Sequence, residues 1–391
     1  MQPLGISHYT VTSAAGRGRD AHLHALRDER SGLRQKTFET CPIPCWIGEV
    51  DGLEAPLPAE HADWDCRNNR LAWLGLQQDD FLYAAHQLRE RHGATRIGVF
   101  IGTSTAGVFS TELAYRERGP SQGPLPAWFN YRTTQSCSSP ADFVRRVLQL
   151  EGAAISIATA CSSSAKVFAS AHRAISAGLC DAAIVGGVDS LCLTTLYGFN
   201  SLQLVSAEIC KPADATRRGI SIGEAAGFAI LEKNTSGLAL LGYGESSDAH
   251  HMSAPHPEGA GAAAAMRGAL ERAGLAPSAI DYVNLHGTAT PANDASEDHG
   301  VCSVLGTETP CSSTKGWTGH TLGAAAITEA CISLLCISHG FLPRSLNTQE
   351  KDPSLRSNIL LAARETPVRH VLSNSFGFGG SNCSLLFGTL A

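Results

Sequence analysis

The chain has 391 residues, a net charge of −6, and 43% hydrophobic residues, enough apolar side chains for a large buried core. The negative charge excludes a general nucleic-acid binder, which needs many cations to neutralise phosphates. The N-terminus has no signal-peptide pattern and no apolar run approaches membrane-spanning length, so we expect a soluble, cytoplasmic protein that contacts neither nucleic acid nor membrane. The thirteen cysteines form no Cys-x-x-Cys pair, so we expect reduced thiols and no structural zinc site.

Short β-rich runs alternate with longer helical patterns, which predicts an α/β fold with largely buried strands. The strand candidates, in chain order, are residues 97–102, 154–158, 182–186, 228–231 and 282–285. The stretch 162–178, rich in Ala, Ser and Val, is predicted to form a buried helix that ends at its glycine. A second helix is expected from about residue 323 to residue 339.

Three segments of the first half are echoed, in the same order, in the second half. IGVFIGTSTAG (97–107) matches DYVNLHGTATP (281–291), and each is a strand that runs into Gly-Thr-x-Thr. ISIATACSSSAKVF matches PCSSTKGWTGHTLGAAA, and AAIVGGVDS matches VLSNSFGFGGSN. The echoes predict an internal duplication into halves 1–235 and 236–391, joined at the polar stretch 234–237.

Cys161 lies directly between a predicted strand and a predicted helix, in TACSSS. A cysteine at a helix N-terminus faces unpaired backbone N–H groups and the positive end of the helix dipole, which favours the thiolate. The small residues around it let a substrate approach closely. We therefore interpret Cys161 as a nucleophile.

A nucleophile needs partners that move protons or stabilise charge. His286 and His320 occupy equivalent late elements, each after a predicted strand and beside glycines, so we expect both to face the cavity of Cys161. Lys315, five residues before His320, is expected to form an ion pair with Glu329 on the following helix.

Four motifs, TACSSS, NLHGTATP, KGWTGHTLGAAAITEA and NSFGFGGSN, together resemble those of the elongating β-ketoacyl-acyl-carrier-protein synthases. The resemblance covers essentially the whole chain. It implies the thiolase fold, a duplicated five-layer αβαβα architecture, in a dimer whose active site lies between the halves. It also implies a reaction that needs no metal and no other cofactor, and a phosphopantetheinylated acyl carrier protein as partner.

The resemblance assigns roles to matching positions. It makes Cys161 the acyl acceptor and His286 and His320 the decarboxylation pair, and Lys315 matches a lysine that orders the second histidine, with Glu329 as its partner.

The GFGG run at 377–380 resembles a gating loop, in which the backbone N–H of Phe378 joins that of Cys161 in an oxyanion hole. Thr288 and Thr290 match threonines that hydrogen-bond the phosphopantetheine arm, and Thr105 matches a position near the acyl pocket. The substrate-binding residues that the resemblance implies are therefore Thr288, Thr290, Thr105, Gly377 and Gly379.

Arg67 and Arg70, in DCRNNRLAW, have near-helical spacing and are expected to face the acidic carrier protein, unless they only form a solvated helix face. Arg217 and Arg218 are a second, weaker candidate pair.

The cluster His250, His251 and His256 has a spacing that fits no common metal-ligand pattern, and its prolines indicate an irregular loop. We expect no metal there.

Two departures from the family pattern leave the pathway open. ADATRRGISIGEAAG rearranges the usual aspartate-plus-RDG run, and Thr105 stands where enzymes of saturated fatty-acid synthesis carry a bulkier aliphatic residue. RNNRLA and the compact length resemble enzymes of polyene or aryl-polyene pathways. Fatty-acid and polyene or polyketide roles both remain open, as do a homodimer and a heterodimer with a chain-length-factor paralogue.

Related classes fit the sequence less well. A thiolase would carry a second cysteine near Phe378, and a starter-type synthase would have asparagine for one of the two histidines. We expect decarboxylative Claisen condensation of malonyl-acyl-carrier protein with a Cys-bound acyl chain. The alternative is a non-catalytic or partner-dependent subunit like a chain-length factor, which would typically have lost Cys161.

Overall fold

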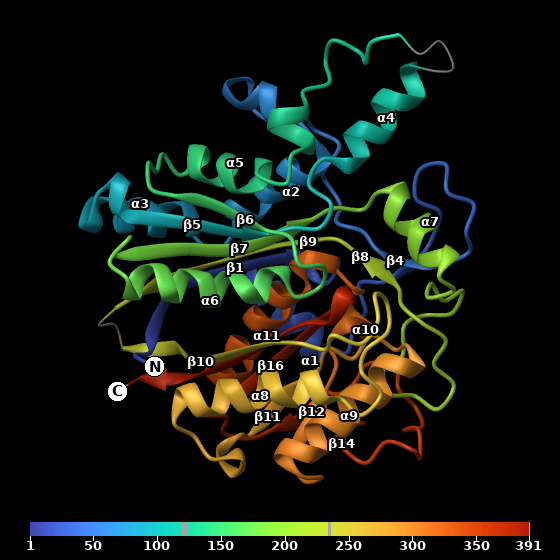
Figure 1. Cartoon of the computed structure of the whole chain (residues 1–391). Coiled ribbons are helices and arrows are strands. Elements are labelled where there is room, and N and C mark those ends of the chain that lie inside the picture. The colour runs from blue at the N-terminus through green and yellow to red at the C-terminus, as the bar shows by residue number, and fades with distance from the viewer. Residues whose placement is uncertain (119–122, 234–235, 391) are drawn as a thin grey trace.

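The computed structural model describes residues 1–118, 123–233 and 236–390, and its elements form five layers (Figure 1). Helices α2, α3 and α5 cover one sheet, α6 and α11 lie between the two sheets, and α8 and α9 cover the second. The bounds are α2 (Arg67–Leu76), α3 (Phe81–His92), α5 (Ser139–Val147), α6 (Ser163–Ser176), α8 (Ala260–Ala273), α9 (Pro291–Leu305) and α11 (Ala325–His339). The predicted five-layer αβαβα fold is therefore confirmed.

The two sheets join at one edge, where β1 pairs with β10 over two residues, and they repeat one strand order. The first runs β6-β5-β7-β9-β1 and the second β12-β11-β16-β17-β10, with β14 added beyond β12. In each sheet, the first three strands pair in parallel with their neighbours. The two pairings that follow, of the third strand with the fourth and of the fourth with the fifth, are antiparallel. The bounds are β1 (Leu4–Ser13), β5 (Ile97–Gly102), β6 (Ala154–Ile157), β7 (Ala182–Asp189), β9 (Ala225–Glu232), β10 (Gly237–Ser247), β11 (Tyr282–Asn284), β12 (Pro310–Ser312), β14 (Asn358–Ile359), β16 (Val371–Gly377) and β17 (Ser381–Leu390).

The three sequence echoes occupy equivalent places in this repeat. They fall on β5 and β11, on β6 and β12 with the helices that follow, and on β7 and β16. An alanine with positive φ lies at each turn, but at different positions: Ala289, at 65°, is the third residue of its Gly-Thr-x-Thr, whereas Ala106, at 43°, follows the last threonine of the other. The repeat therefore holds for the strands but not for the detailed conformation of the two turns. The predicted boundary at 235/236 lies partly outside the described residues.

Helix α11 forms the centre of the molecule. The segment Leu322–His339 has 18 residues and is apolar enough, by length and composition, to cross a membrane, although Thr328 and Glu329 interrupt its apolar run. It is 89% buried, because both sheets pack against it. Its composition is that of a core helix, and it ends where Gly340 adopts φ of 59°.

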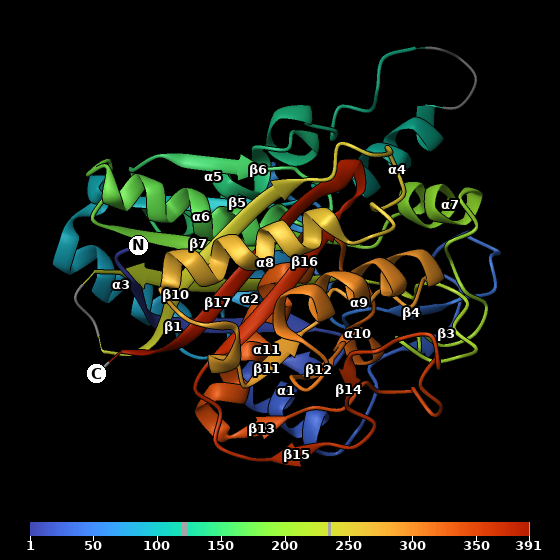
Figure 2. The ribbon, with the colours of Figure 1, turned by 60° about the horizontal axis from the view of Figure 1, so that its bottom comes forward.

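The two halves meet where the active site forms. Helix α8 lies across β10 and β17 on the far side of the second sheet (Figure 2). On the other side of that sheet, the loops after β5, β11 and β12 approach the N-termini of α6 and α11. These loops carry the residues that the sequence singles out.

Strand β6 lies at the edge of the first sheet, with Ile155 exposed over 44% of its surface. Beyond this edge, α4 (Val108–Arg118) and the turn at Tyr131–Gln135 project from the molecule (Figure 1). Tyr115, Trp128 and Tyr131 are exposed in this projection.

Candidate active site

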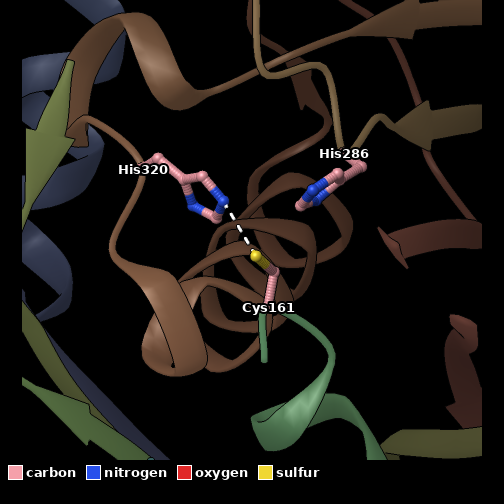
Figure 3. Close-up of side chains that lie close together, drawn as sticks. All are labelled: Cys161, His286 and His320. Carbon is pink, nitrogen blue, oxygen red and sulfur yellow. Dashed lines mark hydrogen bonds between the residues drawn. The ribbon is translucent and has the colours of Figure 1, made fainter. Parts of the chain in front are cut away.

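Cys161 sits in a tight turn between β6 and α6. Ala160 before it has φ of 53°, and the side chain of Ser163 fixes the turn by accepting from the Thr159 N–H at 2.9 Å and donating to Ala160 O at 2.5 Å. The thiol is 95% buried and points toward loops of the second half (Figure 3). The turn therefore places a sulfur of the first half among side chains of the second.

Two histidines face this sulfur (Figure 3). His320 Nε2 lies 3.1 Å from Cys161 Sγ, and the ring of His286 is 5.3 Å from that of His320, nearly perpendicular at 82°. The backbone N–H of His286 donates to Glu297 Oε1 at 2.8 Å, and that of His320 to Ser221 O at 2.7 Å. The structure thus brings together the three predicted catalytic side chains.

Lys315 and Glu329 form the predicted ion pair, buried beneath His286. Lys315 Nζ also donates to His286 O and lies 3.4 Å from His286 Nδ1. The expectation that Lys315 orders the second histidine is therefore wrong: its side chain extends under the loop after β11 and contacts the first. His320 follows α10 (Lys315–Thr318) and turns away toward Cys161.

Burial controls the charges of these groups. It lowers the pKa of His286 and of His320 well below the usual 6.5, with Lys315 acting in the same direction, so both imidazoles are neutral at neutral pH. Burial raises the pKa of Cys161 to about 11, although Lys315 and the backbone N–H groups of Phe378 and Cys161 oppose the shift. The resting pair is therefore a neutral thiol beside a neutral His320.

This charge state predicts how alkylation of Cys161 depends on pH. Since only the thiolate reacts, the rate with iodoacetamide should rise about tenfold per pH unit between pH 7 and pH 10. Mass spectrometry of the Cys161 peptide measures it, with exposed Cys137 as the internal control. A rate that is already flat above pH 7 would contradict the neutral pair and indicate a thiolate–imidazolium pair.

The GFGG loop supplies a second backbone donor. The N–H of Phe378 reaches the Cys161 sulfur together with the N–H of Cys161 itself. A Cβ on Gly377 would lie 2.9 Å from Thr159 O and 3.2 Å from Cys161 N, so glycine allows the loop to approach this closely. The N–H of Gly379, at φ of 79°, donates to Met252 O at 2.9 Å. Two backbone N–H groups beside a sulfur are the arrangement that an oxyanion hole needs, and that role stays a prediction.

Two cavities meet at Cys161. One, of about 220 Å³, also reaches His286, His320, Thr288 and Thr290. The other, of about 290 Å³, is lined by Ser104, Ala158, Ala160, Cys161, Thr195, Phe199, Leu322 and Phe378.

Phe199 and Phe378 stand between the two cavities, with ring centroids 5.5 Å apart. Phe199, on α7 (Leu193–Ser201), escaped the sequence analysis because a single phenylalanine after glycine carries no chemical signal.

The predicted substrate-binding threonines separate into two groups. Thr288 and Thr290 line the first cavity with hydroxyls 2.9 Å apart, in reach of a polar arm. Thr105 is buried and donates to Asp189 at 2.7 Å, so its assignment to the acyl pocket is wrong. Its neighbour Ser104, in the bend after β5, lines the second cavity instead.

The two arginines expected to dock a carrier protein are held by internal ion pairs. Arg67 makes two hydrogen bonds to buried Glu224, at 2.6 and 2.9 Å, and Arg70 makes two to Asp65, at 2.6 and 2.7 Å. Paired in this way, their guanidinium groups link α2 to its neighbours and leave few donors for an acidic partner. Docking of a carrier protein at these arginines stays a prediction.

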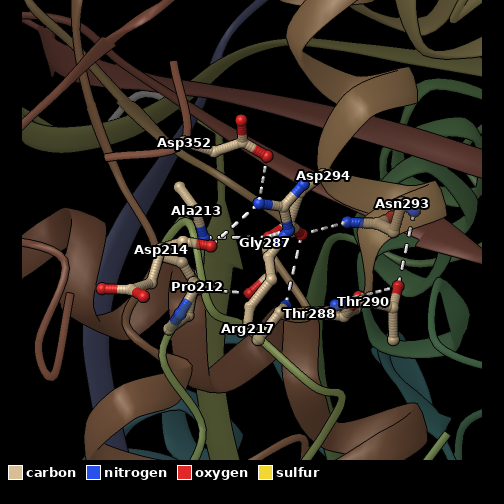
Figure 4. A network of polar contacts seen from close by, with 12 residues as sticks. Pro212, Ala213, Asp214, Arg217, Gly287, Thr288, Thr290, Asn293, Asp294 and Asp352 are labelled. Atoms are coloured by element: carbon tan, nitrogen blue, oxygen red, sulfur yellow. Dashed lines mark hydrogen bonds and ion pairs between the residues drawn. The ribbon is translucent and has the colours of Figure 1, made fainter. Parts of the chain in front are cut away.

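The second arginine pair is divided between the interior and the surface. Arg217 is buried, where it donates to Asp352 at 2.6 Å and lies 3.3 Å from Asp294 (Figure 4). Arg218 is exposed. Arg218 is also close to the first cavity, because the N–H of the next residue, Gly219, donates to Ala289 O at 3.0 Å.

Metal binding would involve the catalytic side chains themselves. The ligand atoms of Cys161, His286 and His320 all lie within 4.8 Å of one another, a spacing that a soft cation could use. In the loop cluster, the rings of His250 and His256 are 5.1 Å apart. The absence of a metal requirement stays a prediction.

Comparisons with known proteins find similar sequences and structures among β-ketoacyl synthases. Sequence models of the β-ketoacyl synthase N-terminal and C-terminal domains match residues 74–236 and 238–349. The 3-oxoacyl-[acyl-carrier-protein] synthase 2 of Vibrio harveyi is 33% identical over 76% of each chain. A mitochondrial 3-oxoacyl-[acyl-carrier-protein] synthase of Arabidopsis thaliana is 39% identical, over 59% of this chain and 55% of its own.

Among solved structures, the complex of a ketosynthase (ApeO) with its chain length factor (ApeC) from Xenorhabdus doucetiae contains a similar chain. It superposes with a TM-score of 0.92 at 38% identity and covers 100% of this chain and 98% of its own. The fold, the motifs and the assembled site agree with these matches, and the chain belongs to the β-ketoacyl synthase family.

Proposed function

We propose that this enzyme extends an acyl chain, delivered by an acyl carrier protein, through decarboxylative condensation with a malonyl unit at Cys161. The observation that carries the proposal is the meeting of two cavities at Cys161, with His286 and His320 on the side of the first. One cavity suits the phosphopantetheine arm, since Thr288 and Thr290 line it, and the other suits the acyl group.

The first half-reaction transfers the acyl group to sulfur. Cys161 Sγ attacks the thioester carbonyl as its proton moves to His320 Nε2, which lies 3.1 Å away. The resulting oxyanion accepts hydrogen bonds from the N–H groups of Cys161 and Phe378. The carbon–sulfur bond to the arm then breaks, and the arm leaves as a thiol after taking the proton from His320.

The second half-reaction makes the carbon–carbon bond. The Lys315 ammonium beside His286 Nδ1 keeps that nitrogen unprotonated, so the ring proton sits on Nε2. His286 donates from Nε2 to the malonyl thioester oxygen as the carboxylate leaves as carbon dioxide. His320 donates to the same oxygen once its ring proton has moved from Nδ1, which has no hydrogen-bond partner among the described residues, to Nε2. The enolate attacks the acyl carbonyl on Cys161, and the Cys161 thiolate leaves and takes up one proton from water, the proton that the condensation consumes overall. The product is a β-ketoacyl thioester on the carrier.

For the substrate class we propose a polyene or polyketide-type chain, and for the partner a chain-length-factor paralogue. RNNRLA supports the first, and the match to a ketosynthase structure determined with its chain length factor supports the second. The alternative, a non-catalytic subunit, would have no use for the assembled Cys161, His286 and His320. We expect the reaction in the cytoplasm.

The exposed edge of β6 supports a dimer. An edge strand with an exposed apolar residue pairs readily with a second chain, and the cavity beside Cys161 borders Ala158, which follows β6. We expect Ile155→Lys to raise the dimer dissociation constant about a hundredfold or more, because burying an unpaired charge costs several kcal/mol. Analytical ultracentrifugation measures it.

Tyr83→Lys, on helix α3, is the matched control, since Tyr83 is 68% exposed and α3 packs on β1, at the opposite end of the strand order from β6. An Ile155→Lys protein that dimerises like the wild type would show that this edge is not the interface.

The substrate proposal is tested with a panel of acyl-carrier proteins, with and without a candidate paralogue, by intact-protein mass spectrometry. An adduct with polyenoyl donors, formed faster than with saturated donors of equal length, supports it. Faster acylation by saturated donors would place the enzyme in fatty-acid synthesis. Full activity of the chain alone would refute the need for a paralogue and leave a homodimer.

A further inference from the structure

Asp189, at the end of β7, is a fully buried carboxylate that joins the two halves of the molecule. Oδ1 accepts from the hydroxyls of Thr103 and Thr105 at 2.8 and 2.7 Å, and from the N–H groups of Ser104 and Thr105 at 2.9 and 2.8 Å. Oδ2 shares the N–H of Ser104, at 3.0 Å, and accepts from the N–H of Gly323, in the second half, at 2.5 Å. One side chain thus holds the loop after β5 against the start of α11.

The donors of these bonds are neutral N–H and O–H groups. A buried carboxylate without a counter-ion is costly unless hydrogen bonds replace its water shell, and here five do so. The buried charge of Asp189 is therefore stabilised by donors from both halves, and its hydrogen bonds hold the two halves together.

Gly323 and Leu322 show how close the contact is. A Cβ on Gly323 would lie 2.6 Å from Asp189 Oδ2 and 2.8 Å from Ser104 Oγ, so no larger residue fits. Leu322 adopts φ of 53°, a left-handed conformation that is unfavourable for a residue with a Cβ. The bond to Gly323 is next to this strained residue and helps to hold it.

The contact also determines the wall of the second cavity. Ser104 and Leu322 both line that cavity, one from each half, and each is adjacent to a residue that Asp189 binds. His320, whose Nε2 faces Cys161, lies two residues before Leu322. The hydrogen bonds of Asp189 therefore position residues that are next to the wall of the second cavity and close in sequence to His320.

We propose that Asp189 is a positioning residue that sets the width of the acyl cavity, and so the length of acyl chain that the enzyme accepts. The inference rests on the proposed function in one respect, the assignment of the second cavity to the acyl group. It adds a specificity determinant that does not itself line the cavity.

Asp189→Asn removes the hydrogen bond to Gly323. The asparagine oxygen can keep the four donors from residues 103–105, but its NH₂ group then faces the Gly323 N–H, donor against donor. Leu322 is released and the cavity widens. We expect kcat/KM for dodecanoyl-carrier protein to rise relative to hexanoyl-carrier protein by about tenfold, the effect of losing one charge-assisted hydrogen bond.

Asp298→Asn is the matched control. Asp298 is also a buried carboxylate bound by N–H and O–H donors, from Arg356 and Ser357 at 2.6–2.9 Å, but it contacts neither cavity at Cys161. Gly323→Ala is the second test variant, because its Cβ pushes on the same contact from the other side. It should change the chain-length ratio in the same direction as Asp189→Asn.

Acylation of each variant by the two donors is followed by intact-protein mass spectrometry, with circular dichroism to confirm folding. A changed ratio in Asp189→Asn and Gly323→Ala, but not in Asp298→Asn, supports the inference. A folded Asp189→Asn or Gly323→Ala variant with the wild-type ratio overturns it, as does an equal change in Asp298→Asn. A wild-type protein that takes no acyl group would instead refute the proposed function.

Discussion

Cys161→Ala is expected to lose acyl-enzyme formation and condensation by a factor of about 10⁴ or more, the scale of removing a catalytic nucleophile. The variant should still decarboxylate malonyl-carrier protein, because the groups that stabilise the enolate are His286 and His320. Both histidines are held by backbone bonds to Glu297 and Ser221, which do not involve the thiol. Intact mass and release of carbon dioxide measure the two activities separately.

His286→Ala is expected to have the opposite effect on the two activities. It should retain acylation of Cys161 but slow decarboxylation by about 10²–10³, the usual cost of one donor to a developing oxyanion. Loss of both activities in Cys161→Ala, with a folded protein, would contradict this division of labour. So would undiminished decarboxylation in His286→Ala.

Lys315→Ala is expected to lower the free energy of unfolding by roughly 3–5 kcal/mol, because it leaves Glu329 as an unpaired buried carboxylate. Burial already raises the pKa of Glu329 to about 7, against the effect of Lys315. Without Lys315 the carboxyl should be protonated in the folded state. A group whose folded pKa is raised stabilises at low pH, so the loss should be smaller at pH 5 than at pH 8.

Urea denaturation measures these values, with Lys351→Ala as the control. Lys351 is partly buried and donates to Ser357 O at 2.9 Å, and among the described residues it forms no ion pair with a carboxylate. Its replacement by alanine should cost about 1 kcal/mol. The double variant Lys315→Met, Glu329→Leu should recover most of the stability but not the decarboxylation rate, since His286 loses the ammonium beside Nδ1. Equal instability of the single and double variants would show that the pair itself is not the cause.

The catalytic groups were predictable because each stands in a strong local context. A strand, a small-residue turn and a helix surround Cys161, and glycines flank His286 and His320, so sequence order alone places them at element ends. The strand prediction for β5 matches its observed bounds, and the helix predicted at 162–178 matches α6 closely. At these positions a reactive side chain lies beside a strand or helix whose sequence pattern is clear.

The roles that the sequence did not reveal depend on partners that are distant in the chain. Arg67 and Arg70 have the spacing of a docking face, but Glu224, more than 150 residues away, makes Arg67 an internal residue. Thr105 differs from Ser104 only in which way its side chain points. Asp189 ends the echoed segment AAIVGGVDS, but that segment does not reveal its role, because one of its partners is Gly323 in the other half. Such contacts are set by tertiary packing, which local patterns do not encode.

The central claim, that an acyl group on Cys161 is extended by a malonyl unit, is tested most directly by a single turnover. Acyl-enzyme is prepared with hexanoyl-carrier protein, freed of excess donor, and mixed with malonyl-carrier protein, and both proteins are weighed by mass spectrometry over time. The account predicts that the hexanoyl adduct leaves Cys161 as one carbon dioxide is released and β-ketooctanoyl-carrier protein appears. An adduct that persists, or that hydrolyses to hexanoate without any β-ketoacyl carrier, would contradict it.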